Sequence, residues 1–322
     1  MRADAGRWYA EKSVAVLGAS GFLGAHLVSR LRPACRDVVA FVHPGAAVFI
    51  EELEGAQLVF GDVRSAADVR RAIHGADVVF QMAGRSGAVA SERAPFDDLD
   101  VNVRGMLTVL EVARSLPAPP RVVFPGSRLQ YGSVESNPVA EDAPMRPLVP
   151  YGLHKHHCEQ LLQLYARRHG IGFAVARLTN PFGPWPTKVR RGYNVLNLMI
   201  ARALEGEAIE VYGDGAQLRD YLYVDDAVDA LLMLGSAPDD PIVNVGSGTG
   251  VSMIEAARAI VRLCGRGDLR HVPWPEDALA VETGDFVADI SAVRARGWEP
   301  RTSLEEGLRK TIECRAAPAW KG

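Results

Sequence analysis

The chain has 322 residues, of which 48% are hydrophobic and 23% charged, which is ordinary for a globular enzyme of one large or two small domains. Its formal net charge of −3 argues against a nucleic-acid partner, because such partners bind basic surfaces. No apolar run reaches the roughly 20 residues that span a bilayer, and the N-terminus lacks a signal-peptide core. We therefore expect a cytoplasmic protein with no membrane partner. The 4 cysteines are scattered without metal-ligand spacing, so no metal is expected.

Short apolar runs alternate with helical patterns over the first half of the chain. Continuous Val, Leu and Phe runs between helices are typical of a parallel sheet covered on both faces. We therefore predict an α/β fold with a doubly wound parallel sheet. The predicted strands are residues 14–17, 38–42, 58–60, 77–82, 121–124 and 173–177, and helices are predicted at 22–31, 65–74, 98–115 and 151–169, where apolar residues recur at three- and four-residue spacing.

The pattern changes after residue 180. Pro181, Gly183, Pro184 and Pro186 predict a rigid loop. The elements that follow are shorter and less periodic, which indicates a smaller lobe with some segments returning to the sheet. We place the boundary between residues 1–178 and 179–322, with the two parts interleaved. The predicted elements of the second part are helices at 195–204, 225–234 and 252–263 and strands at 210–212 and 242–245.

A glycine-rich turn follows the first predicted strand. Residues 18–24 read Gly-Ala-Ser-Gly-Phe-Leu-Gly. In such a turn the first glycine permits the tight bend, the second lets backbone amides approach a pyrophosphate, and the third lets the helix pack on the strand. The helix N-terminus then faces the anion. The alternative is a glycine-rich turn without a ligand, but the strand before it and the helix after it favour a dinucleotide. The cofactor-binding assignment covers Gly18, Ser20, Gly21, Phe22, Leu23 and Gly24.

The end of the second strand bears on the choice between NAD and NADP. A carboxylate there would bind the adenosine ribose, but residues 41–44 read Phe-Val-His-Pro, with Val42 in the expected place. His43 either donates to a 2′-phosphate or is an exposed loop histidine, and both alternatives stay open. Asp62, which precedes Val63, either accepts from the adenine amino group or caps the helix that starts at Ser65. The cofactor is therefore NAD or NADP.

Ser127, Tyr151 and Lys155 form the predicted catalytic site. Tyr151 and Lys155 are four residues apart, so on a helix they share one face. We expect the ammonium to lower the pKa of the phenol from about 10 toward neutrality. Tyr151 can then act as general base for alcohol oxidation and as general acid for ketone reduction. Ser127 follows the fifth strand and would hydrogen-bond the substrate oxygen.

These motifs and several others give the chain a family resemblance. It resembles the extended short-chain dehydrogenase/reductase family, in the branch of nucleotide-sugar epimerases, dehydratases and reductases, from Val14 to about Ile312. The resemblance implies a Rossmann-type N-terminal domain, a C-terminal nucleotide-sugar lobe and often a homodimer formed through a four-helix bundle. The further motifs are residues 61–63, 102–105, 131–132, 177–184, 212–215, 219–226, 244–248 and 297–300.

The resemblance also assigns roles to single residues. It implies that Asn180 contacts the sugar nucleotide and that Arg219 holds its diphosphate, for which the planar guanidinium is suited. From the residues alone, Arg219 next to Asp220 could instead form a local ion pair. The remaining implied residues are Met82, Ala83, Gly84 and Asn102, which together with Val63 would line or support the cofactor site, and Asn194 and Val195, which would lie near the substrate.

The chain also departs from the family pattern. Ser127 is followed by Arg128 and Leu129, whereas 4,6-dehydratases place an Asp-Glu pair there and uronic-acid decarboxylases a Glu, so neither activity is expected. The family's carboxylate is missing from residues 41–44, as described above. Residues 274–277 read Trp-Pro-Glu-Asp, where many members have an arginine that clamps the distal phosphate. Lys188, Arg190 and Arg191 could replace that charge or form a solvated basic loop.

The predicted function is epimerisation of a nucleotide-activated sugar, most plausibly at C4. Tyr151 takes the hydroxyl proton while the hydride goes to the cofactor, the ketosugar rotates, and the hydride returns to the other face. The alternative is an NADPH-dependent ketosugar reductase that uses the same residues in one direction, which the absence of a carboxylate at Val42 favours somewhat. A non-catalytic dinucleotide sensor is less well supported, because Ser127, Tyr151 and Lys155 are all present.

Overall fold

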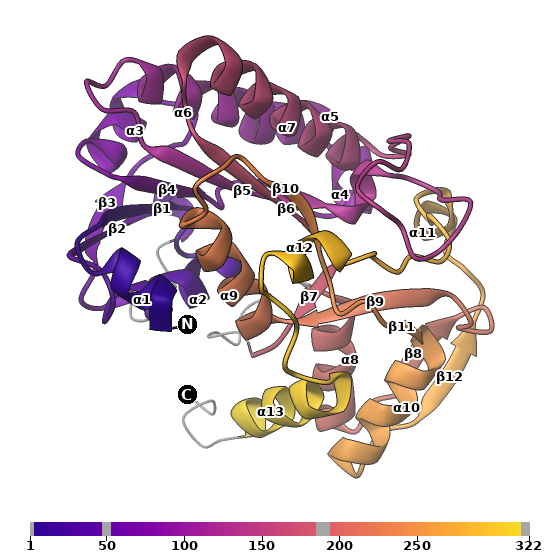
Figure 1. Ribbon diagram of the computed structural model, residues 1–322. Coiled ribbons are helices and arrows are strands. Elements are labelled where there is room, and N and C mark those ends of the chain that lie inside the picture. Colours follow the sequence, from indigo (N-terminus) through magenta and orange to yellow (C-terminus); the bar gives the residue numbers. More distant parts are fainter. Residues whose placement is uncertain (1–2, 47–52, 185–193, 317–322) are drawn as a thin grey trace. The chain divides into compact units, whose positions relative to one another are not determined.

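The computed structural model describes residues 3–46, 53–184 and 194–316 (Figure 1). The chain divides into two compact units. Unit 1 consists of residues 1–132, 144–177 and 228–243. Unit 2 consists of residues 133–143, 178–227 and 244–322. The chain thus enters each unit more than once.

Unit 1 is built on a seven-stranded sheet in the order β10-β6-β5-β4-β1-β2-β3. β1 pairs in parallel with β2 on one side and with β4 on the other, so the direction of winding reverses between β1 and β4. Dinucleotides bind at such a reversal point, beyond the carboxyl ends of the strands. The sheet confirms the predicted Rossmann-type fold. Its strands are β1 (Ser13–Leu17), β2 (Asp37–Val42), β3 (Gln57–Phe60), β4 (Val78–Gln81), β5 (Arg121–Ser127), β6 (Phe173–Leu178) and β10 (Ile242–Val245).

Helices cover both faces of this sheet (Figure 1). α3 (Ala66–Ile73), α6 (Gly105–Arg114) and α7 (Pro150–His169) lie on one face, and α2 (Phe22–Leu31) and α9 (Val224–Gly235) lie on the other. Arg30 of α2 donates to Asp229 of α9 at 2.9 Å. The remaining helical segments of unit 1 are α1 (Ala3–Tyr9), α4 (Ala88–Arg93), α5 (Pro95–Leu99), the π-helical stretch η2 (Asp100–Arg104) and the 3-10 turn η3 (Arg128–Gln130).

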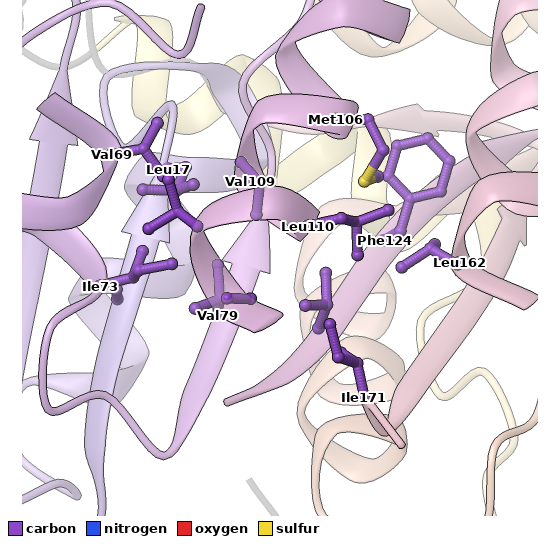
Figure 2. Packing of buried hydrophobic residues seen from close by; sticks show 14 of the residues in the cluster. Leu17, Val69, Ile73, Val79, Met106, Val109, Leu110, Phe124, Leu162 and Ile171 are labelled. Carbon is purple, nitrogen blue, oxygen red and sulfur yellow. The ribbon is translucent and has the colours of Figure 1, made fainter. Parts of the chain in front are cut away.

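The core under α3, α6 and α7 contains the apolar face that the sequence periodicity predicts. Figure 2 shows Leu17 and Val79 of the sheet packed with Ile73 of α3 and Leu110 of α6. All four side chains are fully buried. Each such side chain stabilises the fold by about 1.5–3 kcal/mol relative to an exposed one, so this layer fixes the strands whose ends form the candidate site.

The helix predicted over residues 98–115 is wrong in its bounds. Helical structure starts earlier, at Pro95 in the first turn of α5, and passes through η2 before α6 begins at Gly105. Proline is favoured in a first turn because its missing N–H has no partner there in any case. Within η2 the carbonyl of Asn102 accepts a hydrogen bond from Cys158 Sγ of α7 at 3.3 Å.

Unit 2 contains two small sheets, a three-stranded one in the order β11-β9-β7 and a two-stranded one formed by β12 and β8. The strands are β7 (Asn180–Phe182), β8 (Ile209–Tyr212), β9 (Leu218–Tyr223), β11 (Gly250–Ser252) and β12 (Leu269–Val272), and the helices are α8 (Val195–Glu205), α10 (Met253–Cys264), α11 (Glu276–Ala280), α12 (Ser291–Ala295) and α13 (Leu304–Ala316).

The rigid loop predicted from Pro181 onward is only partly correct. Pro181 lies within β7, which pairs in parallel with β9. β7 is an edge strand of its sheet, where proline is tolerated because one side of the strand needs no donor. Residues 185–193, with Pro186, Lys188, Arg190 and Arg191, lie outside the described residues.

Across the described ranges, no helix combines the length and the hydropathy needed to cross a membrane. A search of the same ranges finds no group of three or more His, Cys, Asp or Glu side chains able to hold a metal ion.

Candidate cofactor and catalytic site

The glycine-rich turn joins β1 to α2 and contacts the end of β4. Gly18 has a φ of +79°, and a Cβ there would lie 2.6 Å from the Cα of Ala83. A Cβ on Gly24 would lie 2.2 Å from the carbonyl oxygen of Gly18. Any larger side chain at either position would separate the turn from its neighbours. The turn is therefore the backbone cradle that a pyrophosphate requires, and Gly21 stands at the N-cap of α2.

The loop after β4 is held in place from both sides. Met82 N donates to the carbonyl of Leu17 at 2.9 Å. Asn102 accepts from Arg85 N at 3.1 Å and donates to the Arg85 carbonyl at 3.2 Å. The predicted residues Met82, Ala83 and Gly84 are thus brought beside the glycine-rich turn, and Asn102 positions the loop that contains them. Their contact with a cofactor stays a prediction.

The end of β2 has no carboxylate. Val42 is fully buried, whereas the His43 side chain is 62% exposed and lies 4.0 Å from Asp62. Asp62 is bound by the guanidinium of Arg64, with Nη2 at 2.6 Å. These hydrogen bonds are the largest cause that lowers the pKa of Asp62 to about 2. The alternative that Asp62 caps α3 is wrong, because Ser65 is the N-cap.

Lys155 is the buried cation of the candidate catalytic site. Its Nζ donates to the carbonyl of Pro125 at 2.8 Å and lies 4.4 Å from the ring centre of Phe124. The same atom lies 5.7 Å from the ring centre of Tyr151, one turn earlier in α7. Burial lowers the pKa of Lys155 to about 8, against the opposing effects of Cys158 and Asp98. The structure thus brings Tyr151 and Lys155 together against β5, which ends at Ser127.

Ser127 is 8% exposed and lies at the N-cap of η3. Its Oγ accepts from Leu129 N at 3.2 Å, while its own N–H donates to Oε1 of Gln130 at 2.7 Å. This is a capping box, which the spacing Ser-x-x-Gln signals in a sequence, although our sequence analysis did not use it. The hydroxyl hydrogen of Ser127 donates to no acceptor among the described side chains and backbone, so it is available to a substrate oxygen.

A buried ion pair connects this serine turn to α7. Arg177 of β6 donates to Glu159 through Nη2 at 2.6 Å and through Nε at 3.0 Å. Gln130 Nε2 donates to the same carboxylate at 2.9 Å, and Tyr131 accepts from Arg177 at 2.7 Å. The side chains of Arg177 and Glu159 are only 7% and 2% exposed. The network fixes the spacing between β5, β6 and α7. The sequence does not reveal it, because Arg177, Glu159 and Gln130 are far apart in the chain.

A second buried network lies beside Lys155. His154 Nδ1 is 2.6 Å from Asp98 Oδ1, and Asn102 Nδ2 donates to the same oxygen at 3.0 Å. This arrangement links α5, η2 and α7 around the Asn102 side chain that positions the β4 loop. It couples the loop after β4 to α7, the helix that contains Tyr151 and Lys155.

Apart from Ser127 and Tyr151, the residues predicted to bind substrate lie in unit 2, where most of them have structural partners. Asn180 Nδ2 donates to the Asp220 carbonyl at 2.9 Å. Asn194 caps α8 by accepting from Asn197 N at 2.8 Å, and Val195 is exposed at the start of that helix. Arg219 is buried and pairs with Glu282 at 2.5 Å. The alternative that Arg219 forms a local ion pair with Asp220 is wrong, because its partner is Glu282. The contacts of these four residues with a sugar nucleotide stay predictions.

The comparison with known proteins extends over nearly the whole chain. A putative UDP-glucose 4-epimerase of Methanocaldococcus jannaschii is 30% identical over 302 residues, 93% of this chain and 97% of that protein. Among solved structures, an epimerase of Methanothermobacter thermautotrophicus superimposes with a TM-score of 0.89 at 26% identity, covering 97% and 94% of the two chains. A Thermus thermophilus UDP-glucose 4-epimerase in complex with NAD has a TM-score of 0.85 at 28% identity, covering 95% and 99%.

The family model gives the same result and confirms the resemblance derived from the motifs. Residues 14–246 match it, a range that includes the glycine-rich turn, Ser127, Tyr151, Lys155 and Arg219. The chain belongs to the NAD dependent epimerase/dehydratase family.

Proposed function

We propose that this chain is an NAD-dependent epimerase of a nucleotide-activated sugar that inverts C4, with Ser127, Tyr151 and Lys155 as catalytic residues. The observation that carries the proposal is the burial of the Lys155 ammonium, with no carboxylate partner among the described residues, 5.7 Å from the Tyr151 ring centre. A desolvated cation beside a phenol favours the phenolate, which is the form that can take a proton from an alcohol.

The residues at the reversal point of the sheet fit NAD. The Gly18–Gly24 turn would hold the pyrophosphate, the loop of Met82, Ala83 and Gly84 would lie along the dinucleotide, and Lys155 would hold the nicotinamide ribose. Bound NAD would supply the acceptor and donor of the hydride that leaves and rejoins the sugar carbon. Asp62 and His43 lie near each other at the β2 and β3 ends, where they would contact the adenosine half.

Side chains of the protein transfer the proton. Ser127 donates its hydroxyl hydrogen to the substrate oxygen, and Tyr151 removes the proton from the sugar hydroxyl as general base. The Lys155 ammonium stabilises the phenolate while the ketosugar turns in the site. Tyr151 then returns the proton to the same oxygen, while the hydride is added to the opposite face of C4. The reaction consumes no external reductant, because the sugar regains the hydride and the proton that it lost.

Replacement of Tyr151 by Phe tests the assignment. We expect Tyr151→Phe to lower turnover of a UDP-hexose by about 10²–10⁴-fold, the usual contribution of a positioned general acid–base, while NAD is retained. Tyr165→Phe is the matched control, because Tyr165 lies in the same helix but donates to Glu111 on α6. Equal turnover by the wild type and Tyr151→Phe would contradict the proposal.

An NADPH-dependent ketosugar reductase is the second candidate, and the buried Val42 in place of a ribose-binding carboxylate is the observation that favours it. Mass spectrometry of the ligand released from denatured protein separates the two. Bound NAD, with epimerisation of a UDP-, dTDP-, GDP- or CDP-sugar in the absence of added cofactor, supports the epimerase. Turnover that requires added NADPH supports the reductase.

We also propose a homodimer, formed through the solvent-facing side of α5, α6 and α7 in unit 1. Large apolar side chains are exposed on these helices: Phe96 at 85%, Leu99 at 46%, Leu107 at 39%, Leu153 at 41% and Leu164 at 39%. Such a concentration of exposed apolar side chains is typical of an interaction surface. Light scattering should give about twice the monomer mass of 34.8 kDa, and Leu107→Glu with Leu164→Glu should reduce it to the monomer value.

A further inference from the structure

We infer that Glu282 is a specificity-determining residue that occupies the diphosphate-binding groups of Arg219, so that a nucleotide sugar must displace it to bind there. The inference rests on the proposed nucleotide-sugar function, which gives Arg219 its role toward the diphosphate. It adds a residue, Glu282, that neither the sequence motifs nor the family assignment identifies as a determinant of binding.

Both terminal nitrogens of Arg219 have hydrogen-bond acceptors within unit 2. Nη2 donates to both carboxylate oxygens of Glu282, at 2.5 and 2.6 Å. Nη1 donates to the carbonyl of Leu218 at 2.9 Å and to the carbonyl of Gly284 at 2.8 Å. The side chains of Arg219 and Glu282 are 7% and 20% exposed. The guanidinium is therefore fixed in place and its charge is compensated within unit 2.

The two halves of the guanidinium have different roles. Nη1 is anchored to the backbone oxygens of Leu218, the first residue of β9, and of Gly284, which follows α11, and these oxygens cannot leave without a change in the backbone. Nη2 is held only by the Glu282 side chain, which can rotate away. At Nη2 an anion must therefore compete with a carboxylate that belongs to the same protein.

Glu282 is suited to this competition. A carboxylate and a phosphate use the same paired oxygens toward a guanidinium, so Glu282 imitates the group that the ligand would present. Its position is reinforced by Gly284 N, which donates to Oε1 at 2.9 Å. If Glu282 stayed in place, a diphosphate would meet a second negative charge at short range. The wild-type protein should consequently gain little affinity from the diphosphate of its ligand.

Calorimetric titration with nucleoside diphosphates tests the inference. UDP, dTDP, GDP and CDP are titrated into wild-type protein and into Glu282→Gln, which keeps the size of the side chain but removes the charge. We expect the best-bound diphosphate to bind at least about tenfold more tightly to Glu282→Gln, equivalent to ~1.4 kcal/mol. The affinity for the corresponding nucleoside, which has no phosphate, should stay the same.

Two further variants test whether the gain in diphosphate affinity comes from the release of Arg219 or from the loss of any negative charge. Glu276→Gln removes an exposed carboxylate from α11 and should leave diphosphate affinity within about twofold, because long-range charge effects in solution are weak. Arg219→Gln combined with Glu282→Gln should abolish the gain, because the gain requires the released Nη2. A gain that persists in this double variant would overturn the inference.

The remaining outcomes are also decisive. Equal diphosphate affinity of the wild type and Glu282→Gln, with epimerase activity present, overturns the inference and leaves the proposed function intact. Failure of both proteins to bind any of the four diphosphates overturns both. If Glu282→Gln does not fold, the ratio of diphosphate to nucleoside affinity of the wild-type protein is the test. A diphosphate bound no more than about tenfold better than its nucleoside supports the inference, and a larger ratio contradicts it.

Discussion

The burial of Lys155 should make the stability of the protein depend on pH in a way that one substitution removes. Its pKa in the folded protein is about 8, below the ordinary 10.5 of an exposed lysine. The unfolded chain therefore binds this proton more tightly than the folded protein does. Folding is penalised in full below pH 8, and the penalty disappears as the pH rises to about 10.5.

The size of the penalty follows from the two pKa values. The difference between 10.5 and about 8 corresponds to ~3 kcal/mol at neutral pH, since one pKa unit is ~1.4 kcal/mol. Between pH 7 and pH 9.5 the wild type should recover about 2 kcal/mol of this amount. Lys155→Met removes the titrating group, so the stability of the variant relative to the wild type should fall by about 2 kcal/mol over the same range. The lost hydrogen bond to Pro125 shifts that difference by a constant and leaves its pH dependence unchanged.

Urea unfolding of the wild type and Lys155→Met at several pH values between 7 and 9.5 measures this difference. Lys310→Met is the matched control, since Lys310 is exposed on α13 and pairs with Glu306 at 2.7 Å. Its pKa is raised by that pair, so the relative stability of this variant should be nearly constant across the range. A relative stability of Lys155→Met that is equally constant would refute the argument that burial lowers the pKa of Lys155.

Other substitutions test the glycine-rich turn, the buried ion pair of unit 1 and the buried Asp220 of unit 2. Gly24→Ala places a Cβ 2.2 Å from the carbonyl of Gly18, so NAD affinity measured by fluorescence titration should fall by at least about tenfold. Glu159→Leu leaves the buried Arg177 charge unpaired and should lower the free energy of unfolding by about 3–5 kcal/mol, whereas adding Arg177→Met should restore most of it. Asp220→Asn brings amide hydrogens against several backbone and hydroxyl donors and should cost about 3 kcal/mol in urea unfolding.

Local signals in the sequence were sufficient for the sheet and for part of the site. α2 begins and ends at the predicted residues Phe22 and Leu31, because its glycine turn and its apolar periodicity agree. The Tyr151–Lys155 pair was predicted from a spacing of four, since a helix brings such residues onto one face. These features depend on neighbours within a few residues, which a sequence displays directly.

The features that the sequence did not reveal depend on distant partners. β9 contains Arg219 and Asp220 in its buried interior, a pattern that does not resemble an apolar strand. The strand forms nonetheless because Arg219 meets Glu282, 63 residues away, and Asp220 accepts from Ser247, 27 residues away. Likewise, nothing near Lys155 in the sequence shows that its ammonium is desolvated. The sequence showed which groups were present but not which of them neutralise one another.

The same difference in neutralisation distinguishes two buried cations, Lys155 in unit 1 and Arg219 in unit 2. Lys155 is buried against a carbonyl and two aromatic rings, so its burial reduces stability, and in the proposed mechanism its charge acts on the Tyr151 phenol. Arg219 is buried with a carboxylate that cancels its charge, and a ligand must replace that carboxylate to use it. A cation that assists a proton transfer must act in every turnover. A cation that selects a ligand needs to lose its carboxylate partner only when the correct ligand binds. The pairing of Arg219 and the isolation of Lys155 are therefore the arrangements that these two roles require.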